Sequence, residues 1–484
     1  MNLTLMQLQN WLPQAQLVNL AAINSEAHQA VIKAVRTDSR SVVAGDLFFA
    51  LKGEKFDGTA FLAQAQAQGA VAVVFEAAHI EQGEHLQHVK ELTVPAYCVP
   101  NARAALGDLA AQWRRQYALQ VMGVTGSNGK TTVTQMIASV LRADPAAPSL
   151  STQGNLNNDI GVPLTLFNLR PDHQRAVVEL GMNHPGEIEV LANYAQPTIG
   201  LVNNAQREHQ EFMATVEAVA IENGEVIRAL PANGVAVFPA QDAYTELWQK
   251  LAGHRQVLTF GFTQGDVQAH NIAWQHGAWT FDLWTAQATL ACQLHIAGRH
   301  NILNALAATA CALAAGMSLP VIVQGLESFE PVKGRSKSCE WQIDRHPFTV
   351  VDDTYNANPD SVLAAIEVLA ELPAPRLLVL GDMGEVGQQG AAFHQEVGAY
   401  AKACGIDTLF TLGDLCAHSS AVFEGAQHFS DMDGLQQSVL AQIAKHNSVW
   451  VKGSRFMRME RVLDALRNRL DSVQAEEREA VHAA

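Results

Sequence analysis

A glycine-rich stretch, residues 123–132 (Gly-Val-Thr-Gly-Ser-Asn-Gly-Lys-Thr-Thr), has the residue types and spacing best suited to chemistry in this chain of 484 residues. Gly126 and Gly129 let backbone N–H groups turn toward an anion, and the start of a following helix adds partial positive charge. Lys130 supplies a cation for the β- and γ-phosphates of a nucleotide, and the Thr131 hydroxyl is placed for Mg²⁺. The predicted nucleotide-binding residues of this stretch are Thr125, Gly126, Ser127, Asn128, Gly129, Lys130, Thr131 and Thr132.

The segments on either side of the stretch fit the same interpretation. Apolar residues from Ala118 to Val124 predict a buried strand, and residues 133–141 have apolar side chains at helical spacing. A strand, a glycine-rich turn and a helix are the context that a phosphate-binding loop needs. The spacing departs from the strict Walker pattern, because Val124 and not glycine stands five residues before Gly129. An ordinary glycine-rich turn is the alternative.

Other polar side chains follow predicted strands. Glu179 ends an apolar strand, and a carboxylate at the C-terminal edge of a strand in an α/β sheet lies beside the phosphate loop. There it can hold Mg²⁺ directly or through water, although a solvated glutamate or an ion-pair partner is the alternative. His209 also follows a strand, but a single histidine is more often a satisfied core or surface residue, so its chemistry alone assigns it no role.

Two blocks offer hydrogen-bonding groups to a polar ligand. Ser39 and Arg40 can donate to carbonyl or phosphate oxygens, and Lys52 adds a cation, although a turn with an incidental Arg–Asp pair is equally compatible with the first block. An asparagine-rich turn is the alternative for the second block. Its three amides suit a sugar or the edge of a diphosphate: Asn155, Asn157 and Asn158.

The order of predicted elements indicates three α/β domains. From Leu119 onward apolar strands alternate with helices, which predicts largely parallel sheets covered on both faces. A stretch rich in Trp, Gln and Thr, about 266–296, interrupts this alternation and predicts an antiparallel insertion. Prolines near residue 96 and a linker near residue 330 divide the chain. The predicted domains are an N-terminal domain (1–96), a central P-loop domain (97–330) and a Rossmann-like C-terminal domain (331–484).

Composition limits the classes of partner. A net charge of −16 argues against nucleic acid as a partner, while it leaves room for a nucleotide in a local pocket. The six cysteines are scattered without a CxxC pair, which predicts free thiols and neither a disulfide framework nor a zinc site. We expect a cytoplasmic protein, because no signal peptide and no apolar run long enough for a membrane span are found.

These blocks together resemble the Mur ligases of peptidoglycan synthesis, over about residues 36–460. Blocks 381–385 and 451–455 are similar in form to those of the ligase that adds a dipeptide. They differ in form from those of its sister ligases, which add single amino acids. The blocks that carry the resemblance are the phosphate loop, 37–58, 154–163, 179–188, 203–209, 298–304, 331–335, 351–359, 381–385 and 451–455.

The resemblance implies roles for particular residues. Ser39, Arg40, Lys52, Asn155, Asn157 and Asn158 would contact the UDP-linked substrate; Thr131, Glu179 and His209 would hold Mg²⁺. Asn301 and Asn304 would lie on the adenine side, with Arg335, Asp352, Tyr355 and Asn356 completing the ATP site from the third domain. Asp382, Lys452, Ser454 and Arg455 would receive the dipeptide. The implied catalytic set is Lys130, Glu179, His209 and Arg335.

The implied reaction is ATP-dependent amide formation, class EC 6.3.2.10. UDP-N-acetylmuramoyl-tripeptide would form an acyl phosphate with the γ-phosphate of ATP, and the amine of D-alanyl-D-alanine would displace phosphate. Two alternatives stay open: a sister ligase that adds one amino acid to a UDP-muramoyl or folate acceptor, and a regulatory protein that hydrolyses ATP as a switch. We expect a monomer that binds neither nucleic acid nor a membrane.

One position departs from the family pattern. Mur ligases of this type usually have a lysine fourteen residues beyond the histidine, and CO₂ converts it to a carbamate that helps to hold a second Mg²⁺. The matching residue is Asn223, which cannot form a carbamate and brings no charge. We therefore expect no carbamylated lysine.

Overall fold

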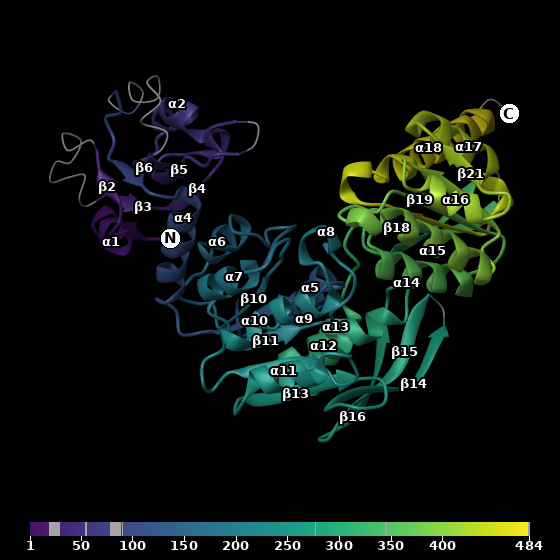
Figure 1. The fold of residues 1–484 in the computed structure, drawn as a ribbon, viewed down its shortest axis with the longest axis horizontal. Coiled ribbons are helices and arrows are strands. Elements are labelled where there is room, and N and C mark those ends of the chain that lie inside the picture. Colours follow the sequence, from purple (N-terminus) through teal and green to yellow (C-terminus); the bar gives the residue numbers. More distant parts are fainter. Residues whose placement is uncertain are drawn as a thin grey trace.

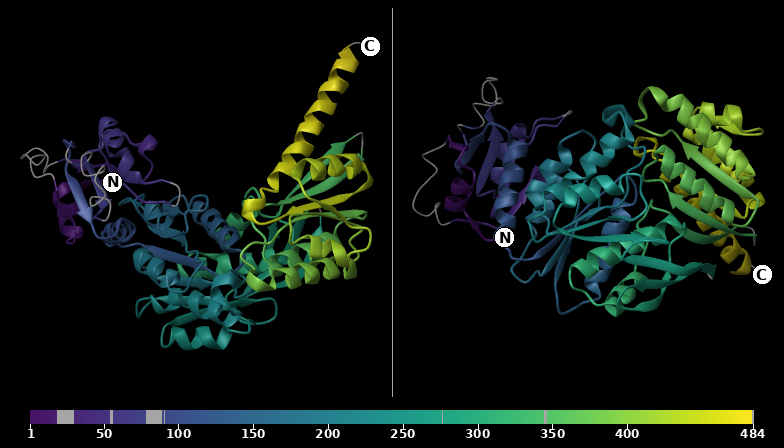
Figure 2. Two further views of the ribbon diagram at one scale, coloured as in Figure 1. Left: turned by 45° about the horizontal axis from the view of Figure 1, so that its top comes forward. Right: turned by 60° about the horizontal axis from the view of Figure 1, so that its bottom comes forward.

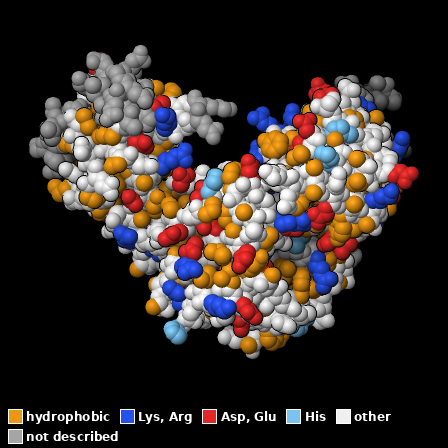
Figure 3. Space-filling view, viewed as in Figure 1, with side chains coloured by type: hydrophobic (Ala, Val, Ile, Leu, Met, Phe, Trp, Pro, Cys, Tyr) orange, Lys and Arg blue, Asp and Glu red, His pale blue; other side chains and the backbone are white. Residues whose placement is uncertain are grey.

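The computed structural model describes residues 1–18, 30–53, 56–77, 89, 91–275, 277–343 and 346–482, and the side chains up to residue 472. Three α/β units follow one another along the chain (Figure 1). The central unit lies between the other two, and the space-filling view shows a hollow between the N-terminal and C-terminal units (Figure 3). Among the described residues, no helix is long and apolar enough to cross a membrane.

The N-terminal unit is built on a five-stranded sheet. Its elements are β1 (Leu3–Thr4), α1 (Leu5–Trp11), β2 (Gln16–Leu17), β3 (Val31–Ile32), β4 (Ala34–Arg36), β5 (Asp46–Phe49), α2 (Leu62–Ala67), β6 (Ala72–Glu76) and β7 (Ala96–Val99). The sheet order is β2-β7-β6-β5-β4, with all neighbours parallel except β2 and β7. Apolar clusters cover both faces, so β5 and β7 are buried at every position. This sheet continues to Val99, past the predicted division at residue 96.

A single helix, α4 (Ala102–Arg114), joins this unit to the next. The Asn101 side chain accepts a hydrogen bond from the backbone N–H of Ala104 and so caps the helix at its start. One side of α4 packs on α1 and β6, and the other side packs on α6 (Gly161–Leu166) and α7 (Glu187–Ala195). The N-terminal sheet and the central sheet therefore share one apolar cluster.

The central unit confirms the predicted parallel sheet and its antiparallel insertion. Its strands are β8 (Gln120–Thr125), β9 (Ser149–Ser151), β10 (Arg175–Glu179), β11 (Ile199–Val202), β12 (Val235–Pro239), β13 (Gln256–Gly261), β14 (Val267–Gln275), β15 (Ala278–Thr285) and β16 (Thr289–Leu294). They form one sheet in the order β16-β15-β14-β13-β12-β11-β8-β10-β9. In this order, all neighbours from β14 through β8 to β9 pair in parallel, whereas β15 pairs antiparallel with both β14 and β16.

Helices cover both faces of the central sheet. The amphipathic helix α5 (Lys130–Arg142) packs with α12 (His300–Ala314) and α13 (Leu319–Glu327) over one face. Helices α4, α6 and α7 lie over the other face. The remaining helices are α8 (Gln210–Met213), α9 (Val216–Asn223), α10 (Glu225–Arg228) and α11 (Thr245–Ala252). This arrangement brings the carboxyl ends of β8, β10 and β11 to one edge.

The C-terminal unit is a six-stranded sheet between two helical layers. Its elements are β17 (Lys337–Ile343), β18 (His346–Asp353), α14 (Pro359–Glu371), β19 (Arg376–Gly381), α15 (Gly390–Ala403), β20 (Thr408–Leu412), α16 (Ala417–Val422), β21 (Gln427–Phe429), α17 (Met432–Gln442), β22 (Ser448–Lys452) and α18 (Glu460–His482). The order is β17-β18-β22-β19-β20-β21, with only β17 antiparallel to its neighbour. Helix α18 extends beyond the sheet (Figure 2).

Candidate active site

A large cavity lies where the central and C-terminal units meet. Its volume is 1760 Å³, and both units contribute to its lining. Most of the predicted site residues border it: Ser127, Asn128, Gly129, Lys130, Thr131, Thr132, Asn155, Asn157, Asn158, Glu179, His209, Asn301, Asn304, Arg335, Tyr355, Asn356, Lys452, Ser454 and Arg455. Residues far apart in the sequence are therefore brought together at the carboxyl edge of the central sheet.

The phosphate loop turns between β8 and α5. Gly126 and Gly129 have φ values of +132° and +82°, which L side chains rarely adopt. Lys130 folds back over the loop and donates to the carbonyl oxygens of Gly126 and Ser127, at 2.5 and 3.0 Å. Its ammonium group also forms an ion pair with Glu208 at 3.1 Å. The cation is thus held beside the start of α5 by groups that a phosphate could replace.

Glu179 lies directly beside this helix start. Its Oε1 accepts hydrogen bonds from the Thr131 hydroxyl at 3.1 Å and from the Asn157 amide at 2.8 Å. The side chain is buried, and its other oxygen, Oε2, has no hydrogen-bond partner. A buried carboxylate oxygen without a donor is an unfavourable arrangement that a cation would relieve.

The segment after β11 carries a second buried carboxylate. Glu208 is 4% exposed, and its Oε1 has no hydrogen-bond partner. Its Oε2 lies 3.1 Å from Lys130 Nζ and 3.7 Å from Nε2 of His209. The other ring nitrogen of His209 lies against the carboxylate of Glu385, from the C-terminal unit, and this contact lowers the pKa of Glu385.

A chain of hydrogen bonds between buried asparagine side chains supports the phosphate loop. Asn301 accepts from Asn304, and Asn304 in turn accepts from Asn203, at 2.8 and 2.9 Å. Asn203 also donates to the carbonyl oxygen of Asn128 in the loop. A side chain at Gly129 would meet Asn304 Oδ1 at 2.5 Å, so only glycine fits here. Asn304 therefore contacts the loop itself, as well as bordering the cavity.

Asn223, the residue at the carbamate position, is fully buried beneath the phosphate loop. Its Oδ1 accepts a hydrogen bond of 2.6 Å from the hydroxyl of Thr125, while its Nδ2 has no partner. The neighbouring Glu222 accepts from the backbone N–H groups of Gly186 and Ile188 at the start of α7. Glu222 is consequently occupied in holding this helix.

The C-terminal unit presents cations to the cavity. The guanidinium of Arg335 stacks on the Tyr355 ring at 4.0 Å, and that of Arg455 lies 6.0 Å from the same ring. Lys452 is buried and donates to Asp353 at 2.6 Å and to the carbonyl oxygen of Asn356 at 2.9 Å. Of these three cations, Lys452 is buried in an ion pair, whereas Arg335 and Arg455 have no such buried pair among the described residues and can meet a ligand.

Asp352 does not border the cavity. Its carboxylate accepts hydrogen bonds from the backbone N–H of Gly334 and from the Thr354 hydroxyl, at 3.0 and 2.7 Å. It thus holds the turn that carries Arg335. The adjacent Asp353 borders the cavity instead.

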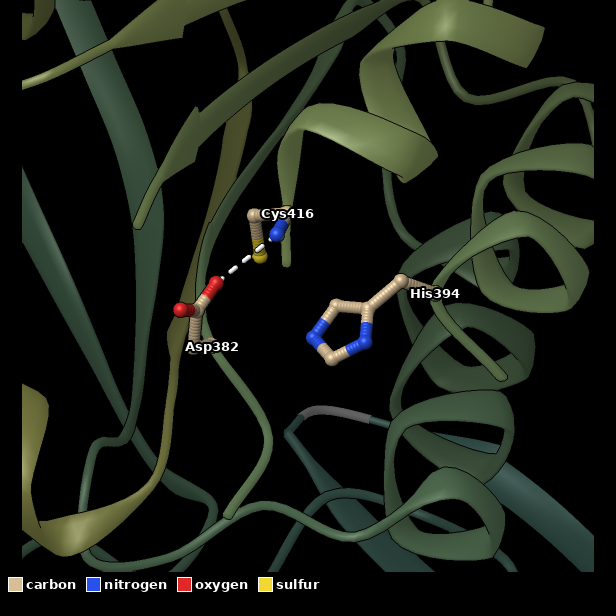
Figure 4. Close-up of side chains that lie close together, drawn as sticks. All are labelled: Asp382, His394 and Cys416. Atoms are coloured by element: carbon tan, nitrogen blue, oxygen red, sulfur yellow. Dashed lines mark hydrogen bonds between the residues drawn. The ribbon is translucent and has the colours of Figure 1, made fainter. Parts of the chain in front are cut away.

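Asp382 does not border the cavity either. Its carboxylate lies beside Cys416, with the His394 ring nearby (Figure 4). Its carboxylate accepts from the backbone N–H groups of Cys416 and Leu415, at 2.7 and 3.3 Å. Nearby, His394 Nε2 accepts from the Met383 N–H at 3.1 Å, and its Nδ1 lies 2.7 Å from the Gly390 carbonyl oxygen. The Asp382 carboxylate and the His394 ring both contact backbone groups, so these two side chains hold the loop after β19 in place. Asp382 supports the site through its carbonyl oxygen, to which Ser454 donates.

The three predicted contacts of the N-terminal unit lie outside this cavity. Ser39 donates to Gln64 at 3.2 Å, and Arg40 forms an exposed ion pair with Asp38 at 2.7 Å. The backbone carbonyl of Lys52 accepts from Arg103, a residue that does border the cavity. Arg103, at the start of α4, is thus a described residue that touches both regions.

Family models match each of the three units. The model described as "Mur ligase family, catalytic domain" matches residues 31–114, "Mur ligase middle domain" matches 124–312, and "Mur ligase, glutamate ligase domain" matches 339–455. A UDP-N-acetylmuramoyl-tripeptide--D-alanyl-D-alanine ligase of Haemophilus influenzae is 38% identical over 465 residues, covering 94% of this chain and 98% of its own length. The chain belongs to the Mur ligase family.

Other relatives of this Mur ligase cover it equally well. The enzyme of the same description from Escherichia coli is 38% identical over 93% of this chain and 97% of its own length. Among solved structures, MurF from Acinetobacter baumannii has a TM-score of 0.87 at 35% identity and covers 96% of this chain and 99% of its own. MurF from Thermotoga maritima, solved with ADP, has a TM-score of 0.78 at 24% identity, covering 93% of this chain and all of its own.

Sequence reasoning missed three residues that the geometry of this Mur ligase brings forward: Asn203, Glu208 and Asp353. Each stood inside a block already recognised, and two of them, Glu208 and Asp353, directly precede or follow the residue that had been chosen. A strand end offers two or three successive polar side chains, and the sequence does not say which of them faces the cavity. For Glu208, adjacency to His209 was the available signal.

Proposed function

We propose that this Mur ligase is the ATP-dependent enzyme (EC 6.3.2.10) that joins D-alanyl-D-alanine to UDP-N-acetylmuramoyl-tripeptide in peptidoglycan synthesis. Full-length relatives with that description support the reaction. The observation that carries the proposal is the shared cavity, where a phosphate loop from the central unit faces cations from the C-terminal unit. Such a site can hold a nucleotide on one side and an incoming carboxylate on the other.

Mg²⁺ is the ion that we propose for the nucleotide. The unpartnered Oε2 of buried Glu179 fits a hard cation, and the Thr131 hydroxyl donates to the same carboxylate. His209 borders the same cavity. When bound, the ion would neutralise phosphate charge and orient the nucleotide.

The chain's own residues contribute positioning and charge. The carboxylate of the tripeptide attacks the γ-phosphorus of ATP, which gives an acyl phosphate and ADP. The amine of D-alanyl-D-alanine then attacks the acyl carbon and expels inorganic phosphate. Lys130 and Arg335 hold the phosphates during transfer, and no residue is required as a covalent nucleophile. Burial of the cavity between two units would limit hydrolysis of the acyl phosphate.

Each substrate would be bound mainly by one unit, with help from a neighbouring unit. Ser39, Arg40 and Lys52 would bind the UDP end of the tripeptide substrate, and the amides of 155–158 would hold its sugar side. Arg455 is exposed near the cavity and would receive the dipeptide carboxylate. We propose the three domains predicted above, with the first boundary moved to the end of β7 at Val99.

A monomer in the cytoplasm is our proposal for the working form. ATP and UDP-linked precursors, the substrates proposed here, are cytoplasmic compounds. Sedimentation analysis with and without ATP would test the monomer.

The test is phosphate release from purified protein across a matrix of acceptors and amines. We expect release only with ATP, a UDP-N-acetylmuramoyl-tripeptide and D-alanyl-D-alanine together, and the matrix should contain diaminopimelate and lysine tripeptides. Lys130→Ala is the matched inactive variant, slower by on the order of 10²-fold or more. Equal turnover with single amino acids would favour a sister ligase. Turnover with ATP alone would favour a regulatory switch.

A further inference from the structure

We propose that Glu208 is a further metal ligand of this site, beside His209, and that it exchanges Lys130 for a divalent cation when nucleotide binds. The inference deepens the proposed function and rests on it.

Glu208 is buried with half of its carboxylate unused. The residue is 4% exposed, its Oε1 has no hydrogen-bond partner, and it borders the cavity. Oε2 is 3.1 Å from Lys130 Nζ and 3.7 Å from His209 Nε2. An oxygen and an imidazole nitrogen that lie this close together can share one divalent ion.

The start of α5 is flanked by two carboxylates of the same kind. Thr131 donates to Glu179, and the preceding residue, Lys130, is paired with Glu208. Each carboxylate keeps one buried oxygen without a donor. Two separate unpartnered oxygens at one phosphate loop point to cations at two positions.

Nucleotide binding should release Glu208 from its present partner. Lys130 is held by the carbonyl oxygens of Gly126 and Ser127 together with Glu208. Phosphates that draw this ammonium away would leave Glu208 charged, buried and alone, which is costly. A cation that arrives with the nucleotide would replace the lost charge.

Other acidic or neutral groups nearby are occupied or exposed. Glu222 caps α7 through two backbone N–H groups. Asn223 is neutral and accepts from Thr125. Glu385 touches His209 but is 42% exposed and comes from the C-terminal unit. Among the described residues of this segment, Glu208 is therefore the buried carboxylate with an oxygen to spare.

Mn²⁺ binding to the full-length protein tests the assignment. Electron paramagnetic resonance would count free and bound Mn²⁺ in the presence of a non-hydrolysable ATP analogue. We expect Glu208→Gln to weaken Mn²⁺ binding by about tenfold or more, and Glu208→Asp, which keeps the charge, to weaken it less. Without metal, Glu208→Gln should bind the analogue at least as tightly as wild type, because Lys130 is no longer held by the carboxylate.

Glu211→Gln is the matched control, since Glu211 is an exposed glutamate in the same segment, and its Mn²⁺ binding should equal that of wild type. Circular dichroism would show that Glu208→Gln is folded. Unchanged Mn²⁺ affinity in folded Glu208→Gln, or analogue binding weakened equally with and without metal, would overturn the metal role and leave Glu208 as a support for Lys130. Failure of the wild type to bind the analogue at all would instead overturn the proposed function.

Discussion

Arg455 and Lys452 come from one sequence block, but the structure gives them different surroundings. The Lys452 side chain is 4% exposed and paired with Asp353, whereas the Arg455 side chain is 61% exposed and meets Glu460 at 3.0 Å. An exposed guanidinium can turn toward a ligand at little cost, but a buried ammonium must first give up its partner. Replacing Arg455 should therefore affect substrate binding, whereas replacing Lys452 should affect the stability of the fold.

We expect Arg455→Ala to raise the apparent KM for D-alanyl-D-alanine far more than that for ATP, because a contact to a carboxylate is lost. Lys452→Ala should instead lower the free energy of unfolding by roughly 3–5 kcal/mol, since Asp353 is left without its cation. Steady-state kinetics and urea unfolding of both variants measure this. Equal increases in both KM values for Arg455→Ala would assign that residue to the nucleotide.

The uncharged residue at position 223 predicts how the enzyme responds to CO₂. Asparagine cannot be carbamylated, and Asn223 is engaged with the hydroxyl of Thr125. We expect ligase activity to be the same in degassed and bicarbonate-supplemented buffer at mildly acid pH. Loss of activity on degassing would mean that another lysine carries a carbamate.

Asn223→Lys is the companion variant. Because position 223 is fully buried beneath Thr125, the longer side chain should first cost stability, in the range of about 1–3 kcal/mol for overpacking. If the folded variant gains activity that depends on CO₂, position 223 faces the metal. Activity that ignores CO₂ would place the new lysine elsewhere.

At the scale of elements, α4 determines how the first unit sits on the second. Gly107 lies where α4 crosses α7, and a side chain there would meet the Tyr194 ring at 2.0 Å. The helix accepts a residue of poor helix propensity because only the absence of a Cβ atom allows this close approach. Burial raises the pKa of the Tyr194 hydroxyl to about 12, in keeping with its packed position.

Gly107→Ala should destabilise the protein by about 1–3 kcal/mol, although alanine is the better helix former. In a Tyr194→Ala background the same change should be neutral or stabilising, because the ring is gone. Calorimetric Tm values of the single and double variants test this. Gly434→Ala in α17, where the nearest atom lies at 3.4 Å, is the control and should not destabilise. A stabilising effect of Gly107→Ala alone would refute the close packing.

At the scale of the whole molecule, one arginine connects the phosphate loop region to the C-terminal unit. Arg207 pairs with Asp360 at 2.6 Å and with Glu396 at 2.7 Å, and its guanidinium lies 5.3 Å from the Phe393 ring. It directly precedes Glu208 and His209. The segment 207–209 therefore contributes side chains to the cavity and also binds the C-terminal unit.

Arg207→Ala should weaken the contact between the two units by roughly 1.5–3 kcal/mol, the value of hydrogen bonds to charged groups. Small-angle X-ray scattering should show a larger radius of gyration, and the KM for ATP should rise because the site uses both units. Arg170→Ala removes an exposed ion pair with Asp172 inside the central unit and serves as control. An unchanged radius of gyration together with unchanged kinetics would show that Arg207 does not hold the units together.

The sequence by itself determined the phosphate loop and the α/β architecture. The loop depends on residues that are adjacent in the chain, two glycines with positive φ, a lysine and a threonine at a helix start, so its chemistry is local. Parallel strands buried on both faces are continuous apolar runs, and the antiparallel insertion interrupts them visibly. Neither feature depends on knowing what packs against it.

Only the tertiary structure decided which polar side chains face the cavity. Asp382 accepts a hydrogen bond from the backbone of Cys416, Lys452 forms an ion pair with Asp353, and Glu208 forms one with Lys130. The partners in these contacts are 34, 99 and 78 residues apart, and the free energy of burying a charge depends on whether such a partner is present. Residue type and spacing identify groups able to do the chemistry, while their long-range partners determine which of them remain available for it.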